Sequence, residues 1–158
     1  MRYRVNLLFF LAVCVGSAIA GQGDTLILAS PEQSRDYWKI KQVTNPYYPG
    51  EAARKGVEGC AAIGFVIESD GSTSNLRSFA GYPPGVFMRA ATDAIRKWKF
   101  TPSETNPSRQ PVYTYQIIEF HLDTGSPARG TEPENPAGKC ASEAKRLFDS
   151  LTGKADAI

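Results

Sequence analysis

Few side chains in this chain are able to do chemistry. His121 is its one histidine, and it lies between Phe120 and Leu122 in an extended apolar run. The alternation of a strand turns His121 away from those two neighbours, which is typical of a surface histidine and not of a positioned general base. The sequence holds no metal-spaced Cys and His cluster, no glycine-rich phosphate loop and no Gly-x-Ser-x-Gly element. We therefore expect no catalytic residues, no metal and no cofactor.

The first of the three cysteines, Cys14, lies in a segment that we expect to be removed. A short basic start is followed by an apolar run over residues 5–16 and by the small-x-small pattern Ser17-Ala18-Ile19-Ala20. This order is typical of a cleaved signal peptide, so we predict cleavage after Ala20 and export. Anchoring in the inner membrane is disfavoured, because the run is shorter than the roughly 20 residues that span a bilayer. Lipidation of Cys14 is disfavoured by the large Val13 before it.

Composition limits the partners of the exported chain. Its 158 residues, 42% hydrophobic and 22% charged, suffice for one ordinary domain plus tails. The chain has 18 Lys and Arg against 16 Asp and Glu, and Arg2 and Arg4 lie in the predicted leader, so the mature chain is close to neutral. It has no dense basic run, so we expect no binding to nucleic acid or to an acidic membrane.

An amphipathic run over residues 90–102 (AATDAIRKWKFTP) organises the predicted elements. Counted from Phe87, its apolar positions are Ala91, Ala94, Ile95 and Trp98. This spacing predicts a helix with one apolar face lying on a flat surface. The basic residues near its end and Pro102 predict that the helix stops there, with Phe100 already extended.

A short helix and a hairpin precede this run. Residues 49–55 predict the helix, which Gly56 ends in a left-handed conformation. Residues 59–68 alternate with the period of a strand, the dipeptide Asp70-Gly71 predicts a tight turn, and residues 73–79 form the returning strand.

The remaining strand candidates differ in strength. Residues 112–122 (VYTYQIIEFHL) are the longest of them. Residues 37–43 (YWKIKQV) form either a strand, with Trp38 and Ile40 on one face, or an ordered lead-in that packs Trp38 on the domain surface. Residues 26–28 are too short to define an element.

Five motifs follow one another between residues 46 and 122. They are Tyr48-Pro49, Val57-Glu58-Gly59, Asp70-Gly71, Trp98-Lys99-Phe100-Thr101-Pro102 and Ile118-x-Phe120-x-Leu122. In this order and spacing they resemble the C-terminal domain of TonB proteins. The resemblance implies an α+β fold, with two helices on one face of a three-stranded antiparallel sheet. It also implies a periplasmic domain that pairs with the TonB-box segment of outer-membrane transporters.

The expected organisation departs from full TonB proteins at both ends. We predict a signal peptide (1–20), a lead segment (21–45), the TonB-like domain (46–122), a Pro/Gly-rich linker (123–139) and a C-terminal helix with a tail (140–158). TonB energy transducers carry a membrane helix and a long proline-rich spacer, whereas this lead would reach only about 25 to 30 Å as a flexible coil. The resemblance therefore supports the fold and the binding mode more than energy transduction.

Two function hypotheses remain open. In the first, a partner peptide, such as a segment of a TonB-dependent transporter, adds as a strand to the sheet edge. The residues of that edge are Val112, Tyr113, Thr114, Tyr115, Gln116, Ile117 and Ile118. In the second, the protein is structural, and its edge is already occupied by its own residues 37–43 or by a second copy in a homodimer.

The last prediction joins Cys60 to Cys140, the two cysteines left after cleavage. Thiols of exported chains are more often paired than free. Cys60 shares a small, apolar strand face with Ala62, Gly64 and Val66, as if something covered it. Residues 144, 147, 148 and 151 form an apolar helical stripe. We predict a third helix over about residues 141–152, outside the TonB resemblance, docked on this face and held by a Cys60–Cys140 disulfide. A tail with unpaired thiols and an intermolecular bridge are the alternatives.

Overall fold

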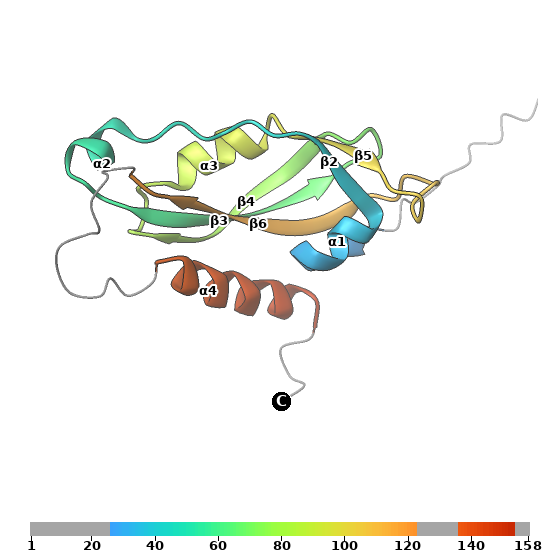
Figure 1. Ribbon diagram of the computed structural model, residues 1–158. Helices are drawn as coiled ribbons and strands as arrows, with labels where there is room; N and C mark the ends of the chain where they lie inside the picture. Colours follow the sequence, from blue (N-terminus) through green and yellow to red (C-terminus); the bar gives the residue numbers. More distant parts are fainter. Residues whose placement is uncertain (1–25, 123–135, 154–158) are drawn as a thin grey trace, which may run out of the picture.

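The structure is a computed structural model that describes residues 26–122 and 136–153. A four-stranded sheet runs through the fold, with helices on both of its faces (Figure 1). Across this sheet the order is β1 (Ile27–Leu28), β6 (Val112–Phe120), β3 (Gly59–Ile67) and β4 (Thr73–Tyr82). Two further strands, β2 (Trp38–Gln42) and β5 (Lys99–Pro102), pair antiparallel with each other. The helices are α1 (Pro31–Tyr37), α2 (Gly50–Arg54), α3 (Met88–Ile95) and α4 (Pro136–Leu151).

The predicted hairpin is formed by β3 and β4. Asp70 Oδ1 accepts a hydrogen bond from the Ser72 amide (2.8 Å), and Gly71 has a φ of 79°. A side chain at Gly71 would collide with the backbone of Phe100, whose amide donates to the Gly71 carbonyl (2.8 Å). Glycine is therefore required here both for the left-handed turn and for the close approach of β5.

The larger core lies between the sheet and the layer of α2 and α3. The predicted apolar face of the 90–102 run is confirmed, since Phe87, Ala91, Ala94, Ile95 and Trp98 are all buried. Helix α3 ends earlier than the run, and Phe100 is extended in β5 as predicted. The short helix is confirmed as α2, and Gly56 after it has a φ of 63°.

Trp98 sits in this core beside Phe100. Its Nε1–H donates to the Thr44 carbonyl (2.9 Å), and its ring lies 6.4 Å from that of Phe100. Phe120 packs against Tyr48 and stacks on Phe87, with ring centroids 4.4 Å apart in the stack. Strand β5 carries the Phe100 ring in beside Trp98 and Phe65.

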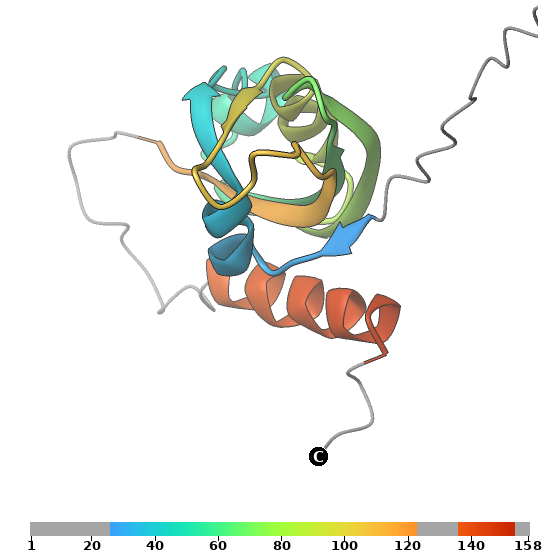
Figure 2. The same ribbon diagram turned by 90° about the vertical axis from the view of Figure 1, so that its right-hand side faces the viewer.

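Helix α4 covers the opposite face of the sheet (Figures 1 and 2). The predicted disulfide joins Cys60 of β3 to Cys140 of α4, and both residues are fully buried. Ala144 and Phe148 pack beside it on Ala62, Val66 and other residues of this face. The cover explains why every residue of β3 is buried, on both faces of the strand. The helix begins at Pro136, five residues before the predicted start.

The N-terminal part of the described chain is where the expected fold must be corrected. The three antiparallel strands are present as β6, β3 and β4, but β1 adds a fourth strand that runs parallel to β6. The segment expected to lack an element thus holds β1, and the unpredicted helix α1 follows it. Residues 37–43 do contain a strand, β2, in which Trp38 is buried while Ile40 is 56% exposed. The predicted signal peptide and residues 123–135 of the predicted linker lie outside the described residues.

Candidate partner-binding edge

The outer edge of β6 is shorter than the sequence analysis expected. Ile27 and Leu28 of β1 pair with Val112 and Tyr113, the first two residues of the expected partner-binding edge. The Ile27 and Ala29 amides donate to the carbonyls of Pro111 and Tyr113, each at 3.0 Å. In the described part of the chain, β1 ends there. Val112 and Tyr113 are therefore not open to a partner while β1 is in place.

The backbone beyond β1 is oriented to receive a strand. Residues of an antiparallel strand point their N–H and C=O groups to alternate sides. Since the Tyr113 carbonyl faces β1, the backbone groups of Tyr115 and Ile117 face the same outer side. The Gln116 side chain donates to the Ile117 carbonyl (3.0 Å), so one outward acceptor already has an intramolecular donor. The stretch of the expected edge that β1 leaves unpaired is thus Tyr115 to Ile118.

A groove of about 690 Å³ runs beside this stretch. Its floor is formed by Tyr115, Gln116 and Ile117. Residues of α1, among them Glu32 and Arg35, line one wall, and residues of α4, among them Ala141 and Lys145, line the other. Figure 2 shows α1 and α4 next to each other below the sheet. The groove is therefore bounded by two helices that lie outside the residues resembling TonB.

Helix α1 is held in place at both of its ends. At the start, Ser30 forms a capping box with Gln33, and Ala29 before it is buried. At the end, Trp38 is 2% exposed and its Nε1–H donates to the Gln110 carbonyl (3.0 Å), just before β6 begins. These contacts fix the α1 wall against β6.

The α4 wall is fixed by the disulfide and by aromatic packing. The Phe148 ring lies 6.4 Å from that of Tyr113 and 5.2 Å from that of Tyr115. Tyr113, Tyr115 and Ile117 therefore face α4, and the residues between them face the larger core layer. Burial raises the pKa of the Tyr115 hydroxyl, and the negative charges of Glu32 and Asp149 raise it further.

The charged side chains that line the groove include as many carboxylates as cations. Glu32 and Arg35 come from α1, and Lys145 and Asp149 come from α4, where these two form an ion pair. The groove therefore presents two carboxylates and two cations, and no excess of either sign.

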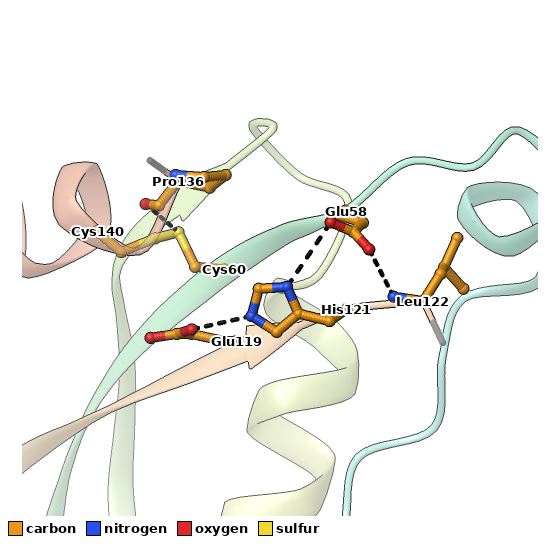
Figure 3. A network of polar contacts seen from close by, with 7 residues as sticks. All are labelled: Glu58, Cys60, Glu119, His121, Leu122, Pro136 and Cys140. Atoms are coloured by element: carbon orange, nitrogen blue, oxygen red, sulfur yellow. Dashed lines mark hydrogen bonds and ion pairs between the residues drawn. A yellow bond between two sulfur atoms is a disulfide. The ribbon is translucent and has the colours of Figure 1, made fainter. Parts of the chain in front are cut away.

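His121 lies beyond the end of this edge and is exposed (Figure 3). Its Nε2 lies 2.9 Å from Glu119 Oε2, and its Nδ1 lies 3.7 Å from Glu58 Oε2. The hydrogen bond to Glu119 is the main cause that raises the pKa of His121, and Glu58 adds to it. Glu58 also accepts from the Leu122 amide (2.7 Å), so this cluster ties the end of β6 to the start of β3. Within residues 26–122 and 136–153, no group of three His, Cys, Asp or Glu side chains is placed to hold a metal ion.

The motif residues predicted from the sequence support the scaffold and lie away from the groove. Tyr48 donates its hydroxyl to the Val57 carbonyl (2.7 Å), and Pro49 is the residue before α2. Gly59 and Phe120 are paired at the joined ends of β3 and β6, and Pro102 ends β5.

Residues 44–122 match the family of the Gram-negative bacterial TonB protein C-terminal. The chain belongs to this family. TonB proteins are non-enzymatic, so this member of the family is not an enzyme. The C-terminal domains of TonB proteins are periplasmic. No helix in the described ranges has the length and apolar character needed to cross a membrane.

Individual TonB proteins are distant relatives. The TonB protein of Pseudomonas aeruginosa is 35% identical over 57 residues, which cover 36% of this chain and 17% of that protein. The TonB protein of Xanthomonas campestris pv. campestris is 30% identical over 83 residues, or 52% of this chain and 37% of that protein. The chain thus spans well under half the length of these curated relatives. The solution structure of the Pseudomonas aeruginosa TonB C-terminal domain has the same fold, with a TM-score of 0.50 at 24% identity over 61% of this chain and 95% of that one.

Proposed function

We propose that this chain is a periplasmic binding domain that takes up a partner peptide as an added strand on β6. The partner is a segment of the TonB-box kind from an outer-membrane transporter, and the role is in transport across the outer membrane. The observation that carries the proposal is the outward-facing backbone of Tyr115 and Ile117 beside a groove. Backbone pairing would supply affinity, and the groove walls would supply selectivity.

One observation favours a second candidate, a structural envelope protein without a role in energy transduction. Part of the edge, Val112 and Tyr113, is already occupied, although by β1 and not by residues 37–43 as expected. Strand β2 of that segment pairs with β5 instead of β6. If self-occupation is the final state, the purified chain binds no peptide and stays monomeric. If a second copy completes the edge, the chain elutes as a dimer. Size-exclusion chromatography, combined with titration of a synthetic TonB-box peptide, separates these candidates, since the first proposal requires a monomer that binds peptide.

A proline at Tyr115 tests the site itself. Proline removes the amide hydrogen that faces outward, and edge strands tolerate such a substitution. The Tyr115 ring packs on Phe148, so the matched control is Tyr115→Ala, which loses the ring but keeps the amide. One net hydrogen bond is worth about 1 kcal/mol, so Tyr115→Pro should bind peptide roughly five-fold more weakly than Tyr115→Ala. Equal affinities in two folded variants would show that the peptide binds elsewhere.

A further inference from the structure

Helix α4 lies beyond the segment that matches the TonB family, yet it forms a wall of the proposed site. The family match ends at residue 122, and α4 begins at Pro136. We propose that α4 is the element that selects the partner, restricting it to an uncharged extended segment with small side chains at the positions that face α4. This inference rests on the proposed function, because it concerns the same groove.

The first step is that α4 has one fixed position. Its first half is bonded to β3 through Cys60–Cys140, and Ala144 and Phe148 are buried against the sheet. A wall held by a covalent bond and by buried packing does not move aside to fit a larger ligand. Its shape therefore restricts the ligand.

The second step is the direction of the partner's side chains. An added strand lies about 4.8 Å from β6, and its side chains alternate between the two faces of the sheet. Every second side chain therefore points to the face of Tyr115 and Ile117, where α4 stands. The α4 residues that line the groove are Ala141, Lys145, Phe148 and Asp149. Ala141 is the smallest of these side chains, so a bulky residue at this position, or opposite it on the partner, would reduce the groove.

The third step is charge. Lys145 is paired with Asp149 on the α4 wall, and the α1 wall carries one carboxylate and one guanidinium, Glu32 and Arg35. A charged side chain of either sign entering this groove would lose hydration, and it would meet a like charge as well as an opposite one, so it would gain no net attraction. An uncharged strand with small apolar or hydroxyl side chains loses little and keeps its backbone pairing.

Two tryptophan substitutions on neighbouring positions of α4 test the wall. The probe is the blocked, uncharged heptapeptide Thr-Val-Ser-Val-Thr-Val-Ser, titrated into the purified chain by calorimetry. Ala141→Trp fills the groove and should weaken binding at least ten-fold. Ser142 is exposed and lines the other side of the helix, so Ser142→Trp should stay within two-fold of wild type. Circular dichroism verifies that both variants fold.

A third variant covers the case in which Ala141→Trp does not fold. The Lys145 side chain is 70% exposed, so Lys145→Glu leaves the fold intact while giving the groove an excess of negative charge. This variant should bind a peptide with lysines in place of the threonine and serine residues at least five-fold more tightly than wild type does.

The outcomes separate the two proposals. If wild type binds the probe and folded Ala141→Trp binds it equally well, or if Lys145→Glu leaves the preference for the lysine peptide unchanged, the α4 inference is wrong and the proposed function stands. If wild type binds neither the probe nor a TonB-box peptide, both are wrong.

Discussion

Removing the Cys60–Cys140 disulfide should destabilise the whole fold. The double variant Cys60→Ala/Cys140→Ala replaces two buried sulfurs with small apolar groups and leaves no unpaired thiol. The bond closes a loop with a sequence separation of 80 residues. The chain-entropy relation for a loop of this length gives about 15 cal/mol/K, or about 4.5 kcal/mol near 25 °C. For a domain of this size, that loss corresponds to a fall in melting temperature of roughly 10 to 20 °C.

The effect should also be uneven across the fold. Without the bond, α4 is held mainly by the burial of Ala144 and Phe148, and the Phe148 side chain contributes about 2 to 3 kcal/mol. An isolated helix of this length is only marginally stable in water, so a docking energy of this size would hold α4 weakly. Hydrogen exchange should therefore show the amides of α4 opening well before those of β3.

Thermal melts followed by circular dichroism measure the first effect, and exchange mass spectrometry measures the second. Wild type in the presence of a reductant is the matched control, because it loses the bond but keeps both sulfurs, and it should melt close to the double variant. A double variant that melts within about 2 °C of oxidised wild type, with α4 still protected from exchange, would refute the assignment of the disulfide as the main anchor of α4.

Two further predictions concern the core and the end of β6. Trp98→Ala removes a buried ring and its hydrogen bond to Thr44, and should lower the free energy of unfolding by about 3 to 5 kcal/mol in a denaturant titration. A decrease below about 1 kcal/mol would contradict the assignment of Trp98 to the core. Glu119, and to a smaller extent Glu58, raise the pKa of His121 above 6.5. The interaction of protonated His121 with these carboxylates therefore stabilises the fold fully below pH 6.5, and this stabilisation is lost as the pH rises through the pKa of His121 in the folded state. An NMR titration of the imidazole should show the raised pKa, with Glu119→Gln lowering it; a wild-type value at or below 6.5 would contradict the cluster.

Two kinds of feature were predicted correctly: elements whose apolar residues repeat at a regular spacing, and a strand face whose small apolar residues required a cover. The helical spacing from Phe87 to Trp98 identified the buried face of α3, and the alternation along β3 identified both of its faces. The small residues on the second face, beginning with Cys60, indicated a cover, and α4 is that cover. Such features are visible in a sequence because burial selects residue types at fixed intervals.

The elements that were missed depend on tertiary contacts. Two residues are too few to show a period, and β1 exists because the Pro111 and Tyr113 carbonyls offer acceptors at the edge of β6. Helix α1 had a local signal that was overlooked, since Ser30-Pro31 followed by Gln33 is a capping box with proline at the first helical position. The groove itself was not predictable, because its walls come from segments more than 100 residues apart that meet only in the folded chain.

The length of the open edge limits the way in which any partner strand is recognised. Of the expected edge, β1 leaves the stretch from Tyr115 to Ile118 unpaired, so a short strand forms few backbone hydrogen bonds there, each worth about 1 kcal/mol net. Most of its selectivity must then come from the groove walls. A longer strand would gain the backbone of Val112 and Tyr113 only by displacing β1. That exchange is nearly balanced, because β1 pairs through two residues and the side chain of one of them, Leu28, remains 43% exposed. A partner longer than the open stretch therefore gains little affinity from the added length, and its sequence opposite α1 and α4 decides whether it binds.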